Sequence, residues 1–334
     1  FKDNPIIAPL PDAPWQSACT CNPGAWYDGQ LVHLLYRGAP DNDRHPIYFG
    51  YATSEDGLRF KRVGRTPVFG PSRDGFDAGC IEDPRIVRFG STYYVTYATR
   101  LFAPGPYYRH TIGLDYHVPP QFLDEFAPEA ARTNLTRTGL AATPDFKRWT
   151  RLGPISRADV DDRDVILFPE TVDGKFVMLH RPVSWIGPEH GVEKPCIWIA
   201  FSHDLLTWRE SRVLAQPQFA WESSKIGGAS PPLRTEHGWL MLYHGVDETR
   251  TYRVGVMMLD LHNPRRVIAR GPEPILEPEE PYERVGLVPN VVFPCGNVVI
   301  KDTLFVYYGG ADTVCGVATA KLQDVVDYVM AHPV

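Results

Sequence analysis

Two adjacent acids, Glu82 and Asp83, stand between a glycine-rich loop and a predicted strand, and Pro84 and Arg85 follow them directly. Proline cannot donate a hydrogen bond to a sheet ladder, which suits the first position of a strand, and it disfavours helical backbone at the residue before it. Asp83 is therefore predicted in extended backbone at a strand mouth, where a carboxylate can serve as a general acid or base. The alternative is a structural ion pair between Asp83 and Arg85, since such pairs also perturb acids.

Five hairpin patterns recur along the chain, and they predict the framework that carries these acids. Each joins two strand-like runs through a tight turn, and the first turns at Asp28-Gly29, a strong hairpin signal. The copies occupy residues 22–37, 83–97, 167–181, 232–244 and 290–308. Further strands bring each copy to about four. We therefore predict an all-β fold, a five-bladed β-propeller that forms one catalytic domain over residues 1–334. A β-sandwich with similar hairpins is the alternative.

Three segments fall outside the repeat. Residues 4–7 are predicted to form an edge strand that closes the ring onto the last blade. Residues 101–134 form an insertion rich in aromatic residues, and a loop this long in a compact domain is usually functional or mobile, so it is expected to cover the cleft or to form a subunit contact. Residues 322–330 carry apolar side chains at helical spacing, which predicts a short C-terminal helix.

The composition excludes several classes of function. A net charge of −6 and a pI near 6.0 argue against a nucleic-acid-binding surface, and no apolar run is long enough to predict a membrane span. The six cysteines lack a convincing zinc spacing, so reduced, buried thiols in a cytoplasmic protein are expected. The eleven histidines show no clustered ligand spacing, and phosphate-loop, dinucleotide-binding and nucleophile-elbow motifs are absent. No metal or cofactor is therefore expected.

A propeller brings the first strand of every hairpin to one shared funnel. Besides Asp83, this places Arg163 and Arg181 of the third copy and Lys225 of the fourth near the same mouth. Arginine binds phosphate oxygens with two parallel hydrogen bonds and lysine adds a point charge, so three such cations indicate an anion site. The alternative for Arg163 is a pairing with a neighbouring aspartate at position 161, 162 or 164. The funnel should also receive His244, Asn290, Phe293 and Asp312.

Short strings spread over the chain resemble glycoside hydrolase family 130, whose members are mostly β-mannoside phosphorylases, with some β-1,2-mannosidases. The strings are Glu82-Asp83-Pro84-Arg85, Leu167-Phe168-Pro169, His180-Arg181-Pro182, Lys225-Ile226-Gly227, Tyr243-His244-Gly245-Val246, Pro289-Asn290-Val291-Val292-Phe293-Pro294-Cys295 and Tyr307-Tyr308-Gly309-Gly310-Ala311-Asp312. The resemblance covers nearly the whole chain, and only the insertion at residues 101–134 has no match.

The resemblance implies roles for ten residues. Asp83 would be the general acid. Phosphate would be bound by Arg163, Arg181, Lys225, His244 and Tyr252, and the mannosyl unit would contact Asn22, Arg37, Phe293 and Asp312. The implied reaction is inverting phosphorolysis of β-mannosides such as mannobiose, mannooligosaccharides or mannosyl-N-acetylglucosamine. Inorganic phosphate would be the co-substrate, α-mannose 1-phosphate the product, and the proton would travel through a hydroxyl of the mannosyl ring.

Such a reaction sets conditions on the acid. Because phosphate is already a nucleophile, a phosphorylase needs an acid but no base. Asp83 must be protonated before the transfer, so its pKa is expected to be raised by burial or by a nearby anion such as Glu82. Arg85 would oppose that rise, and its side chain is therefore expected to point away or to be engaged elsewhere.

Two other functions stay open from the sequence. In hydrolytic members of the family a glutamate activates water, and Glu170 and Glu222 lie close in sequence to the proposed site, although the retained cations favour phosphorolysis. A non-catalytic, sugar-binding propeller is the second alternative. The sequence leaves the linkage (β-1,4 or β-1,2), the leaving sugar and the chain length undetermined, and it is compatible with a homo-oligomer.

Overall fold

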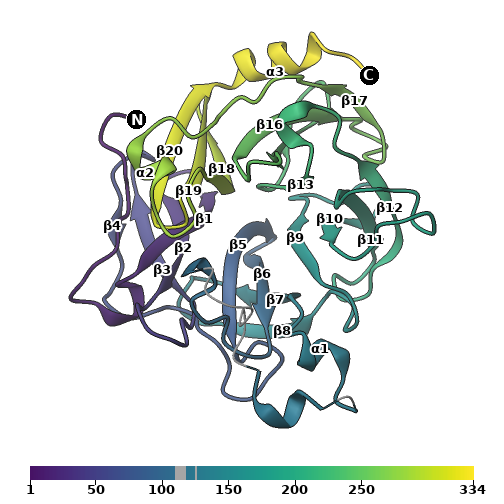
Figure 1. Cartoon of the computed structure of the whole chain (residues 1–334). Coiled ribbons are helices and arrows are strands. Elements are labelled where there is room, and N and C mark those ends of the chain that lie inside the picture. Colours follow the sequence, from purple (N-terminus) through teal and green to yellow (C-terminus); the bar gives the residue numbers. More distant parts are fainter. Residues whose placement is uncertain (110–117, 125) are drawn as a thin grey trace.

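The computed structural model describes residues 1–109, 118–124 and 126–334, so three aromatic residues of the insertion, His110, Tyr116 and His117, lie outside the described residues. Five antiparallel sheets stand side by side in a ring, each forming one blade (Figure 1). The prediction of a mainly-β, five-bladed propeller from the repeated hairpins is therefore confirmed.

Blades 1 to 3 each contain four strands that hydrogen-bond in chain order from the inside of the ring to the outside, and blade 4 has four strands in this order and a fifth beside them (Figure 1). Blade 1 contains β1 (Cys19–Tyr27), β2 (Val32–Ala39), β3 (Tyr48–Ser54) and β4 (Lys61–Arg62). Blade 2 contains β5 (Cys80–Phe89), β6 (Thr92–Arg100), β7 (Arg137–Thr143) and β8 (Thr150–Pro154). Blade 3 contains β9 (Asp162–Leu167), β10 (Phe176–Pro182), β11 (Ile197–Ser202) and β12 (Arg209–Ala215). Blade 4 contains β13 (Lys225–Gly228), β15 (Trp239–Val246), β16 (Tyr252–Leu259) and β17 (Val267–Arg270), with the short β14 (Leu233–Arg234) added beside β15.

The fifth blade is completed by residues from the other end of the chain. Its own strands are β18 (Val292–Ile300), β19 (Thr303–Gly310) and β20 (Val314–Lys321). Ile7 forms an antiparallel bridge with Cys315, and the side-chain amide of Asn4 exchanges two hydrogen bonds of 3.0 Å with the backbone of Val317. The predicted closure of the ring by residues 4–7 is thus confirmed, although it consists of one bridge and a side-chain contact rather than a full strand.

The hydrophobic core is divided into clusters that lie between neighbouring blades. Successive residues of one strand point to opposite faces of its sheet, so they enter different clusters. Leu34 packs toward blade 5 and Leu35 toward blade 2, while Ile86 packs toward blade 1 and Val87 toward blade 3. Each blade is thereby buried on both faces, and this fixes the inner strands relative to one another.

An aspartate turn closes the outer part of blades 1 to 4. In blades 1 to 3 the carboxylates of Asp56, Asp145 and Asp204 each accept hydrogen bonds from the backbone N–H groups two and three residues later. Asp260 makes the same turn in blade 4. These turns lie away from the inner strands and belong to the framework.

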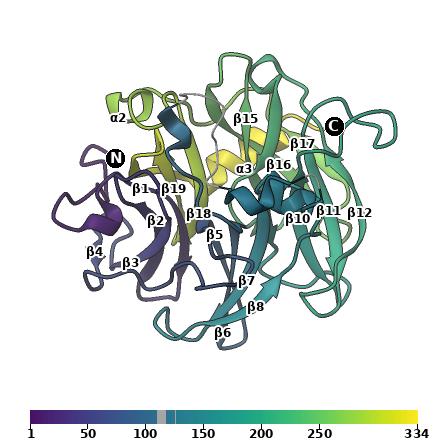
Figure 2. The same cartoon turned by 60° about the horizontal axis from the view of Figure 1, so that its bottom comes forward.

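Helices are short and peripheral. The 3₁₀ helices are η1 (Pro14–Gln16), η2 (Tyr107–Arg109), η3 (Pro120–Phe122) and η4 (Ala220–Glu222), and the α-helices are α1 (Glu129–Arg132), α2 (Pro281–Arg284) and α3 (Leu322–Met330). The C-terminal helix predicted at residues 322–330 is confirmed as α3, and its Val325, Val326 and Val329 pack between blades 4 and 5. Figure 2 brings blade 2, which carries the insertion, to the front. Among the described residues no helix is long and apolar enough to cross a membrane.

Shortening Ile7 should weaken the closure of the ring. Ile7 is buried between blades 5 and 1, and an isoleucine-to-alanine change in a core costs about 2–5 kcal/mol because it leaves a cavity. We expect Ile7→Ala to lower the thermal midpoint, measured by circular dichroism, while the exposed control Lys2→Ala leaves it unchanged. An unchanged midpoint in Ile7→Ala would show that this contact does not hold the ring shut.

Candidate active site

The innermost strands of the first three blades carry the same local distortion. In each, two residues oppose a single residue of the next strand, which is a β-bulge, and the first of the two has positive φ. These residues are Asn22 (φ 48°), Asp83 (φ 54°) and Asp164 (φ 53°). Asparagine and aspartate tolerate the left-handed region better than other non-glycine residues. A bulge re-aims its side chain, and all three side chains line one pocket.

The prediction of extended backbone at Asp83 is therefore wrong. The strand begins at Cys80 rather than at Pro84, and Pro84 is the second residue of the bulge. Proline is accepted in a sheet at a bulge as well as at a strand start, because a bulged residue leaves the hydrogen-bond ladder. The steric effect of Pro84 does exclude helical backbone at Asp83, but the bulge then selects the left-handed region instead of the extended one.

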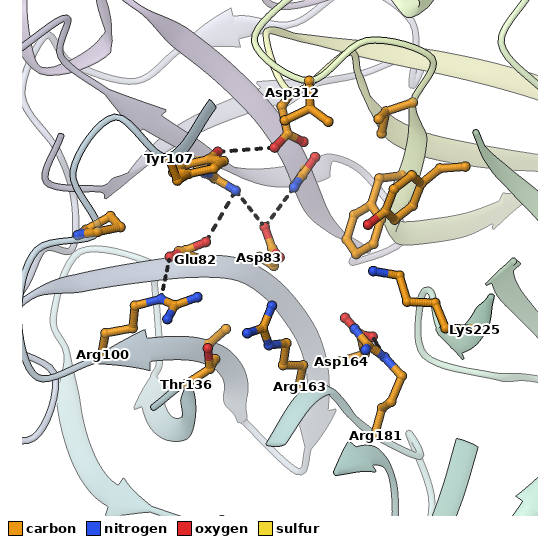
Figure 3. Close-up of a pocket in the computed structure, with 18 residues that line it drawn as sticks. Glu82, Asp83, Arg100, Tyr107, Thr136, Arg163, Asp164, Arg181, Lys225 and Asp312 are labelled. Carbon is orange, nitrogen blue, oxygen red and sulfur yellow. Dashed lines mark hydrogen bonds and ion pairs between the residues drawn. The ribbon is translucent and has the colours of Figure 1, made fainter. Parts of the chain in front are cut away.

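The pocket brings together nine of the ten residues singled out from the sequence. They are Asp83, Arg163, Arg181, Lys225, Tyr252, Asn22, Arg37, Phe293 and Asp312. In Figure 3, Asp83 lies between one side of the pocket, with Asp312 and Tyr107, and the opposite side, with Arg163, Arg181, Asp164 and Lys225. One carboxylate thus faces a group of cations across a shared cavity.

Asp83 is held in place by neighbours that have opposite effects on its pKa. The amide Nδ2 of Asn22 donates to its Oδ1 at 2.8 Å, and Nη1 of Arg37 lies 3.5 Å from the same oxygen. Burial is the largest influence and raises the pKa of Asp83, and the charge of Glu82 raises it further, whereas Arg37, Arg85 and Asn22 lower it. The net result is a pKa raised above the ordinary value, as expected for a group that must carry a proton.

Glu82 differs from its neighbour although it is also buried. Burial alone would raise the pKa of Glu82, but Arg37 and Arg100, at 3.4 and 3.9 Å, outweigh it and lower that pKa. Cys80 donates its thiol proton to Glu82 at 3.2 Å. Two adjacent acids therefore have pKa values displaced in opposite directions. Such a pair contains one group suited to carry a proton, Asp83, and one that stays ionised, Glu82.

Tyr107 of the insertion completes the Asp312 side of the pocket. Its hydroxyl donates to Oδ2 of Asp312 at 3.1 Å and accepts a hydrogen bond from Nη2 of Arg37. The guanidinium of Arg37 also lies over the Tyr107 ring, 5.7 Å from its centre. Burial raises the pKa of Asp312, and the nearby Asp83 and Glu82 add to this, against Arg37. Tyr107, in the described part of the insertion, thus lines the cleft.

The three predicted cations on the opposite side have different partners. Arg163 donates two hydrogen bonds to Asp161, at 2.6 and 2.8 Å, so the pairing considered from the sequence does exist, yet Arg163 still lines the pocket. Arg181 donates from Nε to Oδ2 of Asp164 at 2.6 Å. Lys225 places its Nζ 5.2 Å from the centre of the Tyr252 ring. These side chains come from blades 3 and 4, and they form a positively charged wall.

Two residues expected in the funnel, Asn290 and His244, do not line the pocket, and Asn290 is exposed. His244 is fully buried behind the wall, with its ring 4.7 Å from that of Phe293 and its Nε2 3.6 Å from Asp164. Burial lowers the pKa of His244 to about 3, and the surrounding cations contribute to this against the opposing charge of Asp164. The imidazole is accordingly neutral near pH 7. It does not line the pocket, so it acts on a ligand there only through the side chains that it contacts.

Arg85 is engaged outside the pocket, as expected. Its Nε donates to the carbonyl of Ala229 at 3.2 Å, its Nη1 to the backbone carbonyl of Asp83 at 3.0 Å, and its Nη2 lies 3.5 Å from Oδ1 of Asp164. The side chain therefore contacts the backbone of Asp83 and not its carboxylate. Its charge lowers the pKa of Asp83 without cancelling the effect of burial.

Several lining residues were missed as site residues by sequence reasoning. They are Asp164, Glu82, Arg100, Tyr107 and Thr136, the last two from the insertion and its exit. Asp164 had been considered only as a partner for Arg163. Aligning the hairpin copies would have found it, because Asn22, Asp83 and Asp164 occupy the same bulge position in successive blades. Nothing in the sequence around Tyr107 signals its contact with blades 1 and 5.

A metal site is not formed by the described side chains. Over residues 1–109, 118–124 and 126–334, no group of three or more histidine, cysteine, aspartate or glutamate side chains is arranged to hold an ion. The pocket instead offers five cations (Arg37, Arg100, Arg163, Arg181 and Lys225) and four acids (Glu82, Asp83, Asp164 and Asp312). This chemistry fits an anion together with a neutral, hydroxyl-rich ligand.

The sequence matches a family model of glycoside hydrolase family 130 described as beta-1,4-mannooligosaccharide phosphorylase over residues 10–112 and 130–331. The chain belongs to glycoside hydrolase family 130. The family expected from the dispersed strings is thus confirmed. The interval between the two matched parts lies inside the insertion, but the model also matches residues 101–112 and 130–134, so the expectation that the whole insertion has no match was wrong.

Relatives and solved structures agree with this assignment. The chain is 38% identical over 332 residues to a 1,2-beta-oligomannan phosphorylase of Thermoanaerobacter sp. (strain X514), with 97% of each chain covered. It is 40% identical over 200 residues to a Beta-1,4-mannooligosaccharide phosphorylase of Ruminococcus albus, with 58% of each covered. The structure of Beta-1,2-Mannobiose phosphorylase from Listeria innocua in complex with beta-1,2-mannobiose superimposes with a TM-score of 0.81 at 26% identity, covering 99% of both chains.

Proposed function

We propose that this member of family 130 cleaves β-mannosides by inverting phosphorolysis and releases α-mannose 1-phosphate, with residues 1–334 acting as one catalytic domain. The enzyme class, a glycoside phosphorylase acting on β-mannosides, follows from the family and the relatives. The stereochemistry, the linkage and the roles of individual residues are our proposal. Asp83 is the general acid, and Arg163, Arg181, Lys225 and Tyr252 bind phosphate, with His244 behind them.

One observation carries the choice of phosphorolysis over hydrolysis. The pocket pairs an acid of raised pKa with a cationic wall, and among the described lining residues is neither of the two glutamates considered for water activation. Glu222 is buried outside it with Arg270 Nη2 at 2.5 Å, and Glu170 is exposed with Arg234 at 3.0 Å. Asp164, the acid within the wall, has its pKa lowered because the charges of Arg181 and Arg85 act against its burial, which makes it a weak base.

The proposed mechanism distributes the work between the two sides of the pocket. The cations hold inorganic phosphate in line with the anomeric carbon, which replaces the base-activated water of an inverting hydrolase. Asn22, Arg37, Phe293 and Asp312 contact the mannosyl unit. The proton of Asp83 reaches the leaving oxygen through a mannosyl hydroxyl. The phosphate attacks as the glycosidic bond breaks, so the configuration at the anomeric carbon inverts.

We further propose a β-1,2 linkage between the mannosyl unit and the leaving sugar. The relative that matches 97% of the chain acts on 1,2-linked oligomannan by its name, whereas the β-1,4 relative matches 58%.

We propose a cytoplasmic location on the basis of the cysteines. All six are free thiols and all six are buried, as expected from the sequence. Free thiols persist in a reducing compartment, whereas an oxidising one favours disulfides.

We also propose that the protein forms a homo-oligomer. Phe126 and Leu123 of the insertion are 88% and 62% exposed, an apolar surface that a second copy of the chain would suit.

Removing the proton of Asp83 should stop the chemical step. Asn accepts the positive φ of this position and keeps the shape of the side chain, so Asp83→Asn should fold normally. We expect kcat to fall about 100- to 10,000-fold, the usual contribution of a general acid. Steady-state kinetics on β-1,2-mannobiose with phosphate measures this, with the exposed Asp3→Asn as control. More than a few per cent of the original kcat would remove Asp83 from this role.

Turnover should depend on phosphate. With β-1,2-mannobiose, we expect α-mannose 1-phosphate to form in proportion to bound phosphate, and no cleavage in its absence. Nuclear magnetic resonance of the first product distinguishes the α from the β anomer. Free mannose released equally fast without phosphate would place the enzyme among the hydrolases.

Faster phosphorolysis of β-1,4-mannobiose than of β-1,2-mannobiose would overturn the proposed linkage and leave the proposed reaction type unchanged. Binding of both mannobioses with no turnover would indicate a sugar-binding protein.

The alkaline limb of the pH profile should belong to Asp83. Activity requires the protonated acid, so kcat/KM should be constant below the pKa of Asp83 and fall as the pH rises through it. Asn22 stabilises the ionised carboxylate by donating to it, so its removal should raise that pKa and move the limb to higher pH. Asn22→Gly suits the positive φ at this position and tests the shift. A limb that stays in place or moves to lower pH would contradict the assignment.

A further inference from the structure

Asp164 is an acid in the wall that the proposed reaction assigns to phosphate. It occupies the bulge of β9, lines the pocket and is 5% exposed. Its Oδ2 accepts a hydrogen bond from Nε of Arg181 at 2.6 Å and lies 3.6 Å from Nε2 of His244, while its Oδ1 lies 3.5 Å from Nη2 of Arg85. One of its oxygens thus accepts a hydrogen bond from Arg181, and both oxygens lie near nitrogen atoms of side chains packed around the wall.

A glycine on the neighbouring blade makes room for this arrangement. A Cβ atom at Gly227 would lie 2.3 Å from Oδ2 of Asp164 and 2.5 Å from the His244 ring, closer than any real contact. Gly227 is two residues from Lys225 on β13, so the strand that supplies one cation also leaves space for the acid that contacts another. The Lys225-Ile226-Gly227 string therefore supplies a cation of the wall at Lys225 and leaves space for the Asp164 carboxylate at Gly227.

A carboxylate beside an anion site has two opposing effects. Its charge repels phosphate, which would weaken binding. Its hydrogen bond to Nε fixes the plane of the Arg181 guanidinium, and the Nη groups remain to donate to a ligand in the pocket. The short contact to Arg181 and the nearby Arg85 already neutralise much of the negative charge, so we expect the orienting effect to exceed the repulsion.

We propose that Asp164 is a positioning residue of the phosphate site, which holds Arg181 in the orientation that binds phosphate with two parallel hydrogen bonds. The proposal rests on the phosphorolytic function proposed above. His244 and Gly227 act through Asp164: the imidazole packs against it, and the glycine admits it.

The direction of change in the KM for phosphate tests the proposal. Asp164→Gly accepts the positive φ and removes the carboxylate, and Asp164→Asn keeps the shape and one acceptor oxygen without the charge. We expect the KM for phosphate to rise about 10- to 100-fold in the glycine variant, the usual effect of losing a charged hydrogen bond, and less in the asparagine variant. The KM for β-1,2-mannobiose should change less than about threefold. Arsenate, used in place of phosphate, should respond in parallel.

Other results would overturn the proposal. If repulsion dominates, both variants lower the KM for phosphate. If Asp164 only supports the fold, the KM for both substrates and the thermal midpoint change together. Should the glycine variant fail to fold, the asparagine variant gives the test. Gly227→Ala supports it, since the added methyl group overlaps Asp164 and the His244 ring packed against it without changing any charge.

A double-mutant cycle separates action through Arg181 from an independent effect. In an Arg181→Lys background the fork is already lost, so adding Asp164→Gly should raise the KM for phosphate less than about threefold further. Independent multiplication of the two effects would contradict the proposal.

The matched control is Glu222→Gln. It breaks another buried acid–arginine pair, with Arg270 Nη2 at 2.5 Å, outside the pocket, and should leave the KM for phosphate unchanged. The unaltered enzyme distinguishes failure of this inference from failure of the proposed function. If that enzyme turns over without phosphate, the function is wrong. If it requires phosphate and the Asp164 variants keep its KM, only the positioning role is wrong.

Discussion

The site depends on one backbone device, a β-bulge repeated on the innermost strands of blades 1, 2 and 3. In a regular strand, alternate side chains would enter the clusters between blades, where a carboxylate has no partner. The bulge inserts one residue, takes it into the left-handed region and turns its side chain into the pocket. Asn22, Asp83 and Asp164 can occupy that conformation at little cost because their short polar side chains tolerate it. The same bulge therefore places the amide of Asn22 and the carboxylates of Asp83 and Asp164 around one cavity.

The rigidity of the ring keeps the side chains on these bulges at fixed positions around the pocket. Each blade is buried on both faces, and the fifth is joined to the N-terminal segment by the Ile7–Cys315 bridge. Inner strands that cannot slide relative to one another hold charges from different blades at fixed separations. Arg37 of blade 1 can then stay between Glu82 and Asp83 of blade 2, and Arg181 can stay against Asp164. Preorganisation of this kind is what an in-line attack by phosphate requires.

Charge balance within the pocket explains why one acid can carry a proton while its neighbour does not. Glu82 lies near two arginines, Arg37 at 3.4 Å and Arg100 at 3.9 Å, whereas the carboxylate of Asp83 lies 3.5 Å from Arg37 and accepts a hydrogen bond from the Asn22 amide. Burial acts on both, and the number of close cations decides the direction of each pKa shift. The repulsion between the two carboxylates adds to the difference. Asp164 has a lowered pKa, because Arg181 and Arg85 lie beside it, and the buried imidazole of His244 packs near it. It is therefore an ion-pair partner for arginine rather than a base.

The amino-acid sequence determined the architecture and most of the site. The five recurring hairpins predicted a ring of blades, with a β-sandwich as the alternative. Asp83, Arg163, Arg181 and Lys225 fall at equivalent ends of the hairpins, so their convergence could be predicted. The C-terminal helix was likewise predicted, because helical spacing is a local property. What only the tertiary structure decided depends on contacts between distant segments. The left-handed backbone of Asp83, the burial of His244 behind Phe293 and the reach of Tyr107 to Asp312 are of this kind. The register between strands determines where a bulge forms, and the neighbouring blades determine which side chains are buried. Neither can be predicted from the spacing of residues along a single segment.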